Sequence, residues 1–235
     1  MTILVCLVGA SFARNAVFLS PLQLWADGVV KSPSKRRPHE NYGQALSTEG
    51  YYQEALREFS MVLSLKEDDS VPLRDVYREI GVVDYHLGQF DAAINAWQKG
   101  LRSAAYDTGL LNNLAAVYYT TQRYEEAEAH AKAVLETDPY MPSALNILGE
   151  LYLRQSNYAA ALASFLRAIE VEPNVASRYW NAALACMRLN RYDEARQYVD
   201  RYTSMTNDEN SLQEARALIA KLNMLRDGAR GMVGQ

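Results

Sequence analysis

The sequence predicts an all-α protein, a right-handed superhelical solenoid of about five helix-turn-helix units that ends in a C-terminal capping helix. Two observations predict this fold class. Alanines recur at a regular interval, and other residue types keep a fixed distance from them. Within each interval, apolar residues recur three and four positions apart, which is the spacing of one helix face. A repeat of about 34 residues is typical of proteins in which every unit is one pair of helices.

Five alanines mark the units: Ala55, Ala93, Ala127, Ala161 and Ala195. The last four are evenly spaced, whereas the first interval is longer, which we interpret as an insertion around residues 68–73. An aromatic residue stands three positions before each alanine: Tyr52, Phe90, Tyr124, Tyr158 and Tyr192. A small residue stands twelve positions before: Gly43, Gly81, Ala115, Gly149 and Ala183. Because several residue types stay in phase through five units, the repeat is not accidental.

Each unit reads as two short helices joined by a polar turn. In residues 142–175, Leu148 and Tyr152 lie on one face of the first helix, and Ala161 and Phe165 lie on one face of the second. The small residue of the first helix and the alanine of the second allow the two backbones to approach closely. Pro173 cannot continue a helix, so the second helix is expected to end before it.

This pattern of columns resembles the tetratricopeptide repeat (TPR) family over roughly residues 36–209. The resemblance implies repeats at about 36–69, 74–107, 108–141, 142–175 and 176–209. Three positions depart from the pattern. Asp84 stands in a column otherwise held by Leu, Tyr or Cys, and Ala131 and Val199 are smaller than the aromatic residue that is common there. These departures affect the expected local packing and leave the fold prediction unchanged.

A capping helix is expected at residues 208–227, because the terminal unit of a stack leaves an apolar face uncovered. Its apolar residues Leu212, Ala215, Ile219 and Leu222 are spaced as on one helix face. The Asp227-Gly228 pair predicts its end, and residues 228–235 are expected to fray.

The first 35 residues precede the repeats and leave several interpretations open. Residues 1–13 are apolar and read as a signal-like segment or as the remnant of a membrane helix, while residues 14–35 read as a linker with a possible amphipathic helix. Residues 14–39 resemble the junction between membrane helix and TPR region in O-mannosyltransferase/TMTC-like polytopic proteins. Trp25 either packs with its helix on the first repeat or lies at a lipid interface. The basic cluster Lys31–Arg37 reads as a solvated linker, with contact to anionic lipid as the alternative.

The residues that usually carry chemistry are scattered. The chain has three histidines, His39, His86 and His130, expected on the surface or in a groove, and two cysteines, Cys6 and Cys186, with no metal-ligand spacing among them. There is no glycine-rich phosphate loop and no nucleophile motif. The net charge of −4 gives no general attraction for nucleic acid. We therefore expect no enzymatic activity, no cofactor, no metal and no nucleic-acid partner.

The first helix of each unit is expected to line a concave groove, as the TPR resemblance implies. Four rows of residues skip the packing columns and are predicted to face it: Arg78, Asn112, Asn146 and Trp180; Val82, Ala116, Glu150 and Leu184; Tyr85, Tyr119, Leu153 and Met187; and His86, Arg154 and Arg188 with Thr120. Amide and guanidinium donors beside aromatic and aliphatic side chains suit a peptide. If Trp180 only faces the groove, Trp180→Ala is expected to leave the melting temperature nearly unchanged.

The sequence therefore predicts a TPR scaffold that binds a protein or peptide in this groove, associated with a membrane or the cell envelope. Contact with a membrane would go through residues 1–37, and a cytoplasmic location is the alternative. A second interpretation makes the chain an accessory or detached TPR portion of a membrane glycosyltransferase of the O-mannosyltransferase/TMTC-like class. A third makes it a structural repeat that self-assembles with the groove covered.

Overall fold

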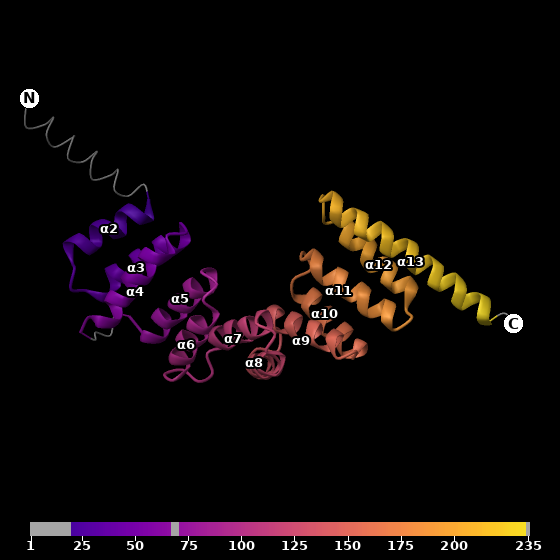
Figure 1. Ribbon diagram of the computed structural model, residues 1–235, viewed down its shortest axis with the longest axis horizontal. Coiled ribbons are helices and arrows are strands. Elements are labelled where there is room, and N and C mark those ends of the chain that lie inside the picture. Colours follow the sequence, from indigo (N-terminus) through magenta and orange to yellow (C-terminus); the bar gives the residue numbers. More distant parts are fainter. Residues whose placement is uncertain (1–19, 67–70, 234–235) are drawn as a thin grey trace, which may run out of the picture. The chain divides into compact units, whose positions relative to one another are not determined.

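The computed structural model of the protein describes residues 20–66 and 71–233, with side chains up to residue 227. The expectations for residues 1–13 and for Cys6 fall outside these residues. The described part of the chain is helical without strands (Figure 1). Helix α2 is followed by five helix pairs and a long last helix: α2 (Pro21–Lys31), α3 (Arg36–Thr48), α4 (Tyr52–Ser64), α5 (Leu73–His86), α6 (Phe90–Leu101), α7 (Thr108–Thr120), α8 (Tyr124–Thr137), α9 (Pro142–Arg154), α10 (Tyr158–Val171), α11 (Ala176–Arg188), α12 (Tyr192–Thr203) and α13 (Glu209–Val233). The predicted all-α repeat fold is confirmed.

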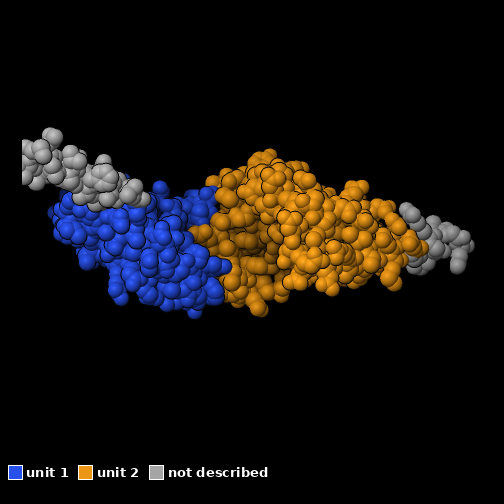
Figure 2. All heavy atoms as spheres, turned by 90° about the horizontal axis from the view of Figure 1, so that it is seen from above, with its two compact units in different colours: residues 1–110 blue, residues 111–235 orange. Residues whose placement is uncertain are grey.

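The chain forms two compact units, residues 1–110 and residues 111–235, which Figure 2 shows in different colours. In the first unit, α2 packs on α3, and the pairs α3–α4 and α5–α6 follow. In the second unit, α9 packs with α8 and α10, α11 with α10 and α12, and α12 with α13. Within each unit, these helices that follow one another in sequence are therefore neighbours in space, as in a stacked repeat.

The first and second helices of a pair fit together by complementary size. A Cβ atom placed on Gly43 would lie 2.7 Å from the Phe59 ring, and one on Gly149 would lie 2.5 Å from the Phe165 ring. Gly81 stands in the same way against Trp97, at 2.3 Å. The two pairs that have alanine in this column have a smaller residue opposite: Ala115 with Ala131, and Ala183 with Val199, all four buried. The smaller residues Ala131 and Val199 therefore stand opposite alanine, whereas the large aromatic residues stand opposite glycine.

The turn inside each pair needs one residue with positive φ. Gly50 and Gly88 supply it in the first two pairs, and Gln122, Ser156 and Asn190 take φ near 60° in the other three. The next residue then donates its N–H back into the first helix, as Tyr51 does to the Leu46 carbonyl at 2.9 Å. This is the Schellman arrangement, which satisfies carbonyls at a helix end.

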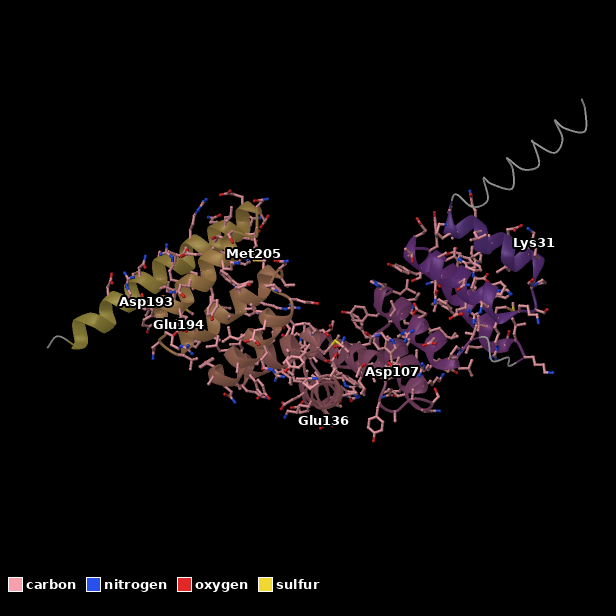
Figure 3. All side chains as sticks on the ribbon, turned by 180° about the vertical axis from the view of Figure 1, so that it is seen from behind. Lys31, Asp107, Glu136, Asp193, Glu194 and Met205 are labelled. Atoms are coloured by element: carbon pink, nitrogen blue, oxygen red, sulfur yellow. The ribbon has the colours of Figure 1, made fainter. Side chains whose placement is uncertain are left out.

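A helix covers the outer repeat at each end of the described chain. Leu22 of α2 packs on the core of the first unit, so the amphipathic helix lies against the first repeat. Ala215, Leu218 and Leu222 of α13 are buried against α12. Arg226 Nη1 of α13 lies 3.6 Å from Asp193 Oδ1 in the first turn of α12. Figure 3 labels Asp193 and Glu194 in this turn, beside α13.

Helix α13 continues through Gly228 to Val233, past the Asp227-Gly228 pair where we expected it to end. A glycine inside an exposed helix costs about 1 kcal/mol relative to alanine, which is not enough by itself to stop a helix. No described helix is long and apolar enough to cross a membrane.

Three polar side chains are buried in the first unit, and for two of them, Arg36 and His39, this differs from the expectation. Arg36 was expected in a solvated linker, but it is 3% exposed and donates from Nη2 to the Leu65 carbonyl at the end of α4, where a positive charge is favourable. His39 was expected on the surface or in a groove, but it is buried with Nδ1 2.6 Å from Glu58 Oε2 and Nε2 3.0 Å from the Pro33 carbonyl. Both positions are fixed by contacts with other segments, which helical periodicity does not report.

The third buried polar residue is Asp84, in the column that is otherwise Leu, Tyr or Cys. Its side chain is 6% exposed, and it forms no hydrogen bond or ion pair with the described residues. Burial raises the pKa of the Asp84 carboxyl above its ordinary value. The sequence departure at this position is therefore a buried acid in the core of the second repeat.

Candidate functional site

The candidate site is the set of half-exposed side chains on the first helices of the repeats. Of the fifteen predicted groove residues, Arg78, Val82, Tyr85 and His86 belong to the first unit, and the other eleven belong to the second. None of the fifteen is fully buried. Figure 2 shows the second unit hollowed on the face seen from above.

Glu150 is the centre of a hydrogen-bonded cluster in the second unit. Its Oε1 accepts from Asn146 Nδ2 at 2.7 Å and from Asn181 Nδ2 at 3.4 Å. The Tyr119 hydroxyl also hydrogen-bonds Glu150, and burial together with this bond raises the pKa of Tyr119 well above its ordinary value. One carboxylate thereby links α7, α9 and α11, the first helices of three successive repeats.

Asn181 is a member of this cluster that the sequence analysis did not identify. It stands two positions before the small-residue column, in a row that also contains Glu79 and Asn113. Four of the five residues in that row are polar, with buried Ile147 as the exception, and this recurrence was the signal that Asn181 faces the same surface. A complete set of groove rows would have included it.

A second hydrogen bond joins α7 and α9 nearby. Ser143 Oγ donates to Asn112 Oδ1 at 2.6 Å, which fixes the orientation of the Asn112 amide. The amide NH2 of Asn112 makes no hydrogen bond with the described residues, and Asn112 is half-buried. Its donor is therefore available to an acceptor that approaches the first helices. Ser143 was not among the predicted groove residues.

Two arginines at the ends of first helices lie over tyrosine rings. The Arg154 guanidinium carbon is 4.2 Å from the centre of the Tyr124 ring, and that of Arg188 is 5.9 Å from the centre of the Tyr158 ring. Tyr124 in turn packs against Tyr119, with ring centres 5.9 Å apart. A shallow cavity of about 480 Å³ lies beside Arg154, lined by Tyr124, Glu125, Leu151, Arg154 and Gln155.

The apolar members of the predicted groove are partly structural. Leu153, Trp180, Leu184 and Met187 are half-buried and pack against the core of the second unit. The Trp180 ring also contacts Tyr202 of α12, with ring centres 5.1 Å apart. Trp180 therefore packs within the unit as well as facing the predicted groove, and its packing indicates that Trp180→Ala lowers the melting temperature.

In the first unit, the predicted groove residues interact mainly with neighbouring side chains. Arg78 Nη2 lies 3.1 Å from Asp75 Oδ1, and the His86 ring stacks on Tyr52 with centres 5.3 Å apart. The Tyr85 ring packs against Phe90 and Trp97. The structure therefore leaves fewer free donors here than on α7, α9 and α11.

The described residues hold no group of three or more histidines, cysteines or acids that lie together as metal ligands would. Cys186 is buried, and burial raises the pKa of its thiol to about 11. Since the thiolate is the reactive form, Cys186 stays inert at neutral pH.

The fold and the repeated helix pairs define a class of helical repeat proteins, and comparison with known proteins specifies the repeat. Residues 79–142 match a family model described as tetratricopeptide repeat, and residues 120–202 match one described as anaphase-promoting complex, cyclosome, subunit 3. Tetratricopeptide repeat is therefore shown for residues 79–142, from within α5 to the first residue of α9. A search among curated proteins found no match.

Three solved structures illustrate the likeness in fold. The peptide-binding TPR protein YrrB has a TM-score of 0.63 and 19% identity, covering 82% of this chain and 97% of its own. The Cut9–Hcn1 hetero-tetramer of APC/C has a TM-score of 0.69 and 17% identity, covering 86% of this chain and 38% of the other. PilF of Pseudomonas aeruginosa has a TM-score of 0.67 and 20% identity, covering 80% of this chain and 89% of its own.

Neither family match includes residues 14–39, and no comparison supports their resemblance to O-mannosyltransferase/TMTC-like proteins. The helix found there, α2, packs on the first repeat through Leu22.

Proposed function

We propose that the protein is a non-enzymatic scaffold that binds an extended segment of a partner protein on α7, α9 and α11. The observation that carries the proposal is the polar surface of these helices. Half-exposed Asn112, Tyr119 and Asn146 are held in fixed orientations by Ser143 and Glu150 on neighbouring turns and repeats. Preorganised amides of this kind suit the donors and acceptors of a peptide backbone, because little side-chain freedom is lost on binding.

The fold neighbours support this proposal. YrrB is described as a TPR protein with an unusual peptide-binding site, and Cut9 is part of a hetero-tetramer with Hcn1. Half-exposed Leu153, Trp180 and Leu184 add apolar contact area beside the amides. A peptide that hydrogen-bonds the amides and places apolar side chains on these residues is the ligand this surface favours.

The experiment is selection from a random dodecapeptide library displayed on phage, with the whole chain as the target. The affinity of each selected peptide is then measured by fluorescence anisotropy. Asn112→Ala with Ala116→Gln removes the free amide and obstructs α7, so selected peptides are expected to bind at least about tenfold more weakly, equivalent to about 1.4 kcal/mol.

The matched control makes the same two changes on exposed second helices. Asn95→Ala with Ala129→Gln changes α6 and α8, where both residues are exposed, and is expected to keep wild-type affinity. Peptides whose affinity falls with the control variant and survives the change in α7 would refute the proposed location. Failure to select any peptide would count against peptide binding itself.

Association with a membrane or the cell envelope remains a prediction from residues 1–37. It is tested by sedimenting the whole chain with anionic phospholipid vesicles, with neutral phosphatidylcholine vesicles as the control. Sedimentation with neither kind of vesicle would remove this prediction and leave the proposed peptide binding unaffected.

A further inference from the structure

The charges of the second unit are segregated between first and second helices. Helices α7, α9 and α11 carry one acidic residue, Glu150, and three arginines, of which Arg154 and Arg188 are exposed and Arg178 is buried and paired with Glu172. The second helices α8, α10 and α12 carry eight acidic residues and four basic ones. In a chain with a net charge of −4, the proposed binding surface is therefore on the positive side of its unit.

The acid on this surface is already engaged. Glu150 accepts from Asn146 and Asn181 through Oε1 and bonds the Tyr119 hydroxyl, so this carboxylate is already bound by donors from the protein itself. A cationic ligand that approached Glu150 would have to displace these donors. Asn146 Oδ1 has no hydrogen-bond partner among the described residues, but this acceptor is buried. The accessible capacity for hydrogen bonds is instead on the donor side, in the Asn112 NH2 group and the exposed Arg154 and Arg188.

Arg154 and Arg188 form no ion pair with the described residues. Most other arginines of the second unit are paired with acids: Arg123 with Glu126, Arg178 with Glu172, Arg191 with Glu194, Arg196 with Asp200, Arg216 with Glu209, and Arg226 with Asp193. The rings of Tyr124 and Tyr158 lie against the two guanidinium groups and limit their freedom. A guanidinium stacked on a ring still presents the N–H groups at its edge, which bind carboxylates.

We propose that the surface selects an acidic segment of the partner, with one carboxylate side chain at Arg154 and a second at Arg188. This inference rests on the proposed function and specifies the chemistry of its ligand. The two arginines occupy the same place in successive repeats, so both face a segment that follows the stack. Asn112 donates to a backbone carbonyl of that segment. An acidic peptide fits better than nucleic acid, because a nucleic-acid groove needs many basic residues interleaved with aromatic ones.

The experiment uses the same phage-displayed dodecapeptides and the whole chain. Peptides selected at low salt are expected to be enriched in Asp and Glu relative to the input library. The best acidic peptide is then titrated against Arg154→Gln with Arg188→Gln, which keeps polarity and much of the size and removes the charges. We expect its affinity to fall at least about tenfold and to lose most of its salt dependence. Arg154→Lys with Arg188→Lys is expected to recover part of it.

Arg201→Gln is the matched control, because Arg201 is also exposed and also lies over a tyrosine ring, Tyr179, but stands on the second helix α12. It is expected to leave the affinity within about twofold. Equal losses with Arg201→Gln and with the Arg154/Arg188 variant would overturn the proposal. So would tighter binding of a twelve-nucleotide oligothymidylate than of the acidic peptide.

The outcome also separates this proposal from the function on which it rests. If the selected peptides are neutral or basic and lose affinity with the Asn112/Ala116 variant, the surface binds peptides but does not select acids. If no peptide depends on either set of residues, both proposals fail.

Discussion

Gly149→Ala tests whether the size match between the two helices of a repeat stabilises the stack. The added Cβ would lie 2.5 Å from Phe165 Cε1 and 2.7 Å from Cζ, about 1 Å closer than ordinary contact, and the ring is fully buried. Overpacking of this kind costs about 2–3 kcal/mol, while replacing a helical glycine by alanine returns about 1 kcal/mol. The expected net loss is about 1–2 kcal/mol of unfolding free energy, measured by urea denaturation followed by circular dichroism.

Gly28→Ala is the matched control. Gly28 is also inside a helix, but a Cβ there would lie 3.7 Å from Trp25 and 3.8 Å from Pro38, which is ordinary contact. This variant is expected to gain about 0.5–1 kcal/mol. The two glycines therefore predict effects of opposite sign for the same chemical change.

A double-mutant cycle isolates the contact itself. Gly149→Ala with Phe165→Val reproduces the Ala183–Val199 pair found in the fifth repeat. The valine removes the atoms that meet the new Cβ and with them the overpacking cost, so the double variant is expected to be more stable than the sum of the single effects by about 2–3 kcal/mol. Additive effects, or a stabilising Gly149→Ala, would refute the size-match argument.

Four further variants test other positions by the same denaturation assay. Asp84→Leu removes a buried acid and is expected to stabilise the protein by about 1–3 kcal/mol at pH 7. Because folding raises the pKa of Asp84, the free-energy cost of the buried carboxylate is present above the folded pKa and vanishes below the ordinary value of 3.8. The gain should therefore disappear at acid pH, and a gain that is independent of pH would contradict this argument. Gln122→Gly relieves a positive φ and is expected to gain about 0.5–1 kcal/mol, whereas Gly50→Ala should lose stability at the equivalent turn position. Trp180→Ala is expected to lose about 2 kcal/mol because its ring packs on Tyr202, and an unchanged midpoint would restore the view that it only faces a ligand.

The sequence predicted what depends on local periodicity. The small-residue and aromatic columns indicated which faces of the helix pairs meet, because residues at a fixed spacing on a helix lie on a fixed face. The turn residues follow the same logic, since Gly50, Gly88 and their counterparts stand at one place in the repeat.

What the sequence did not predict depends on contacts between segments. Arg36 and His39 are buried by the end of α4 and by Glu58 and Pro33, none of which belongs to their own helix. Asn181 belongs to the Glu150 cluster because α9 and α11 stack side by side, and the row pattern alone did not state which amide meets which carboxylate.

The central claim is that a partner segment binds on α7, α9 and α11, and an NMR titration of the isotope-labelled chain with a selected peptide tests it most directly. We predict that the backbone amides of these three helices, including those of Asn112, Tyr119 and Asn146, show the largest shift changes. Changes confined to α8, α10 and α12 would contradict the claim.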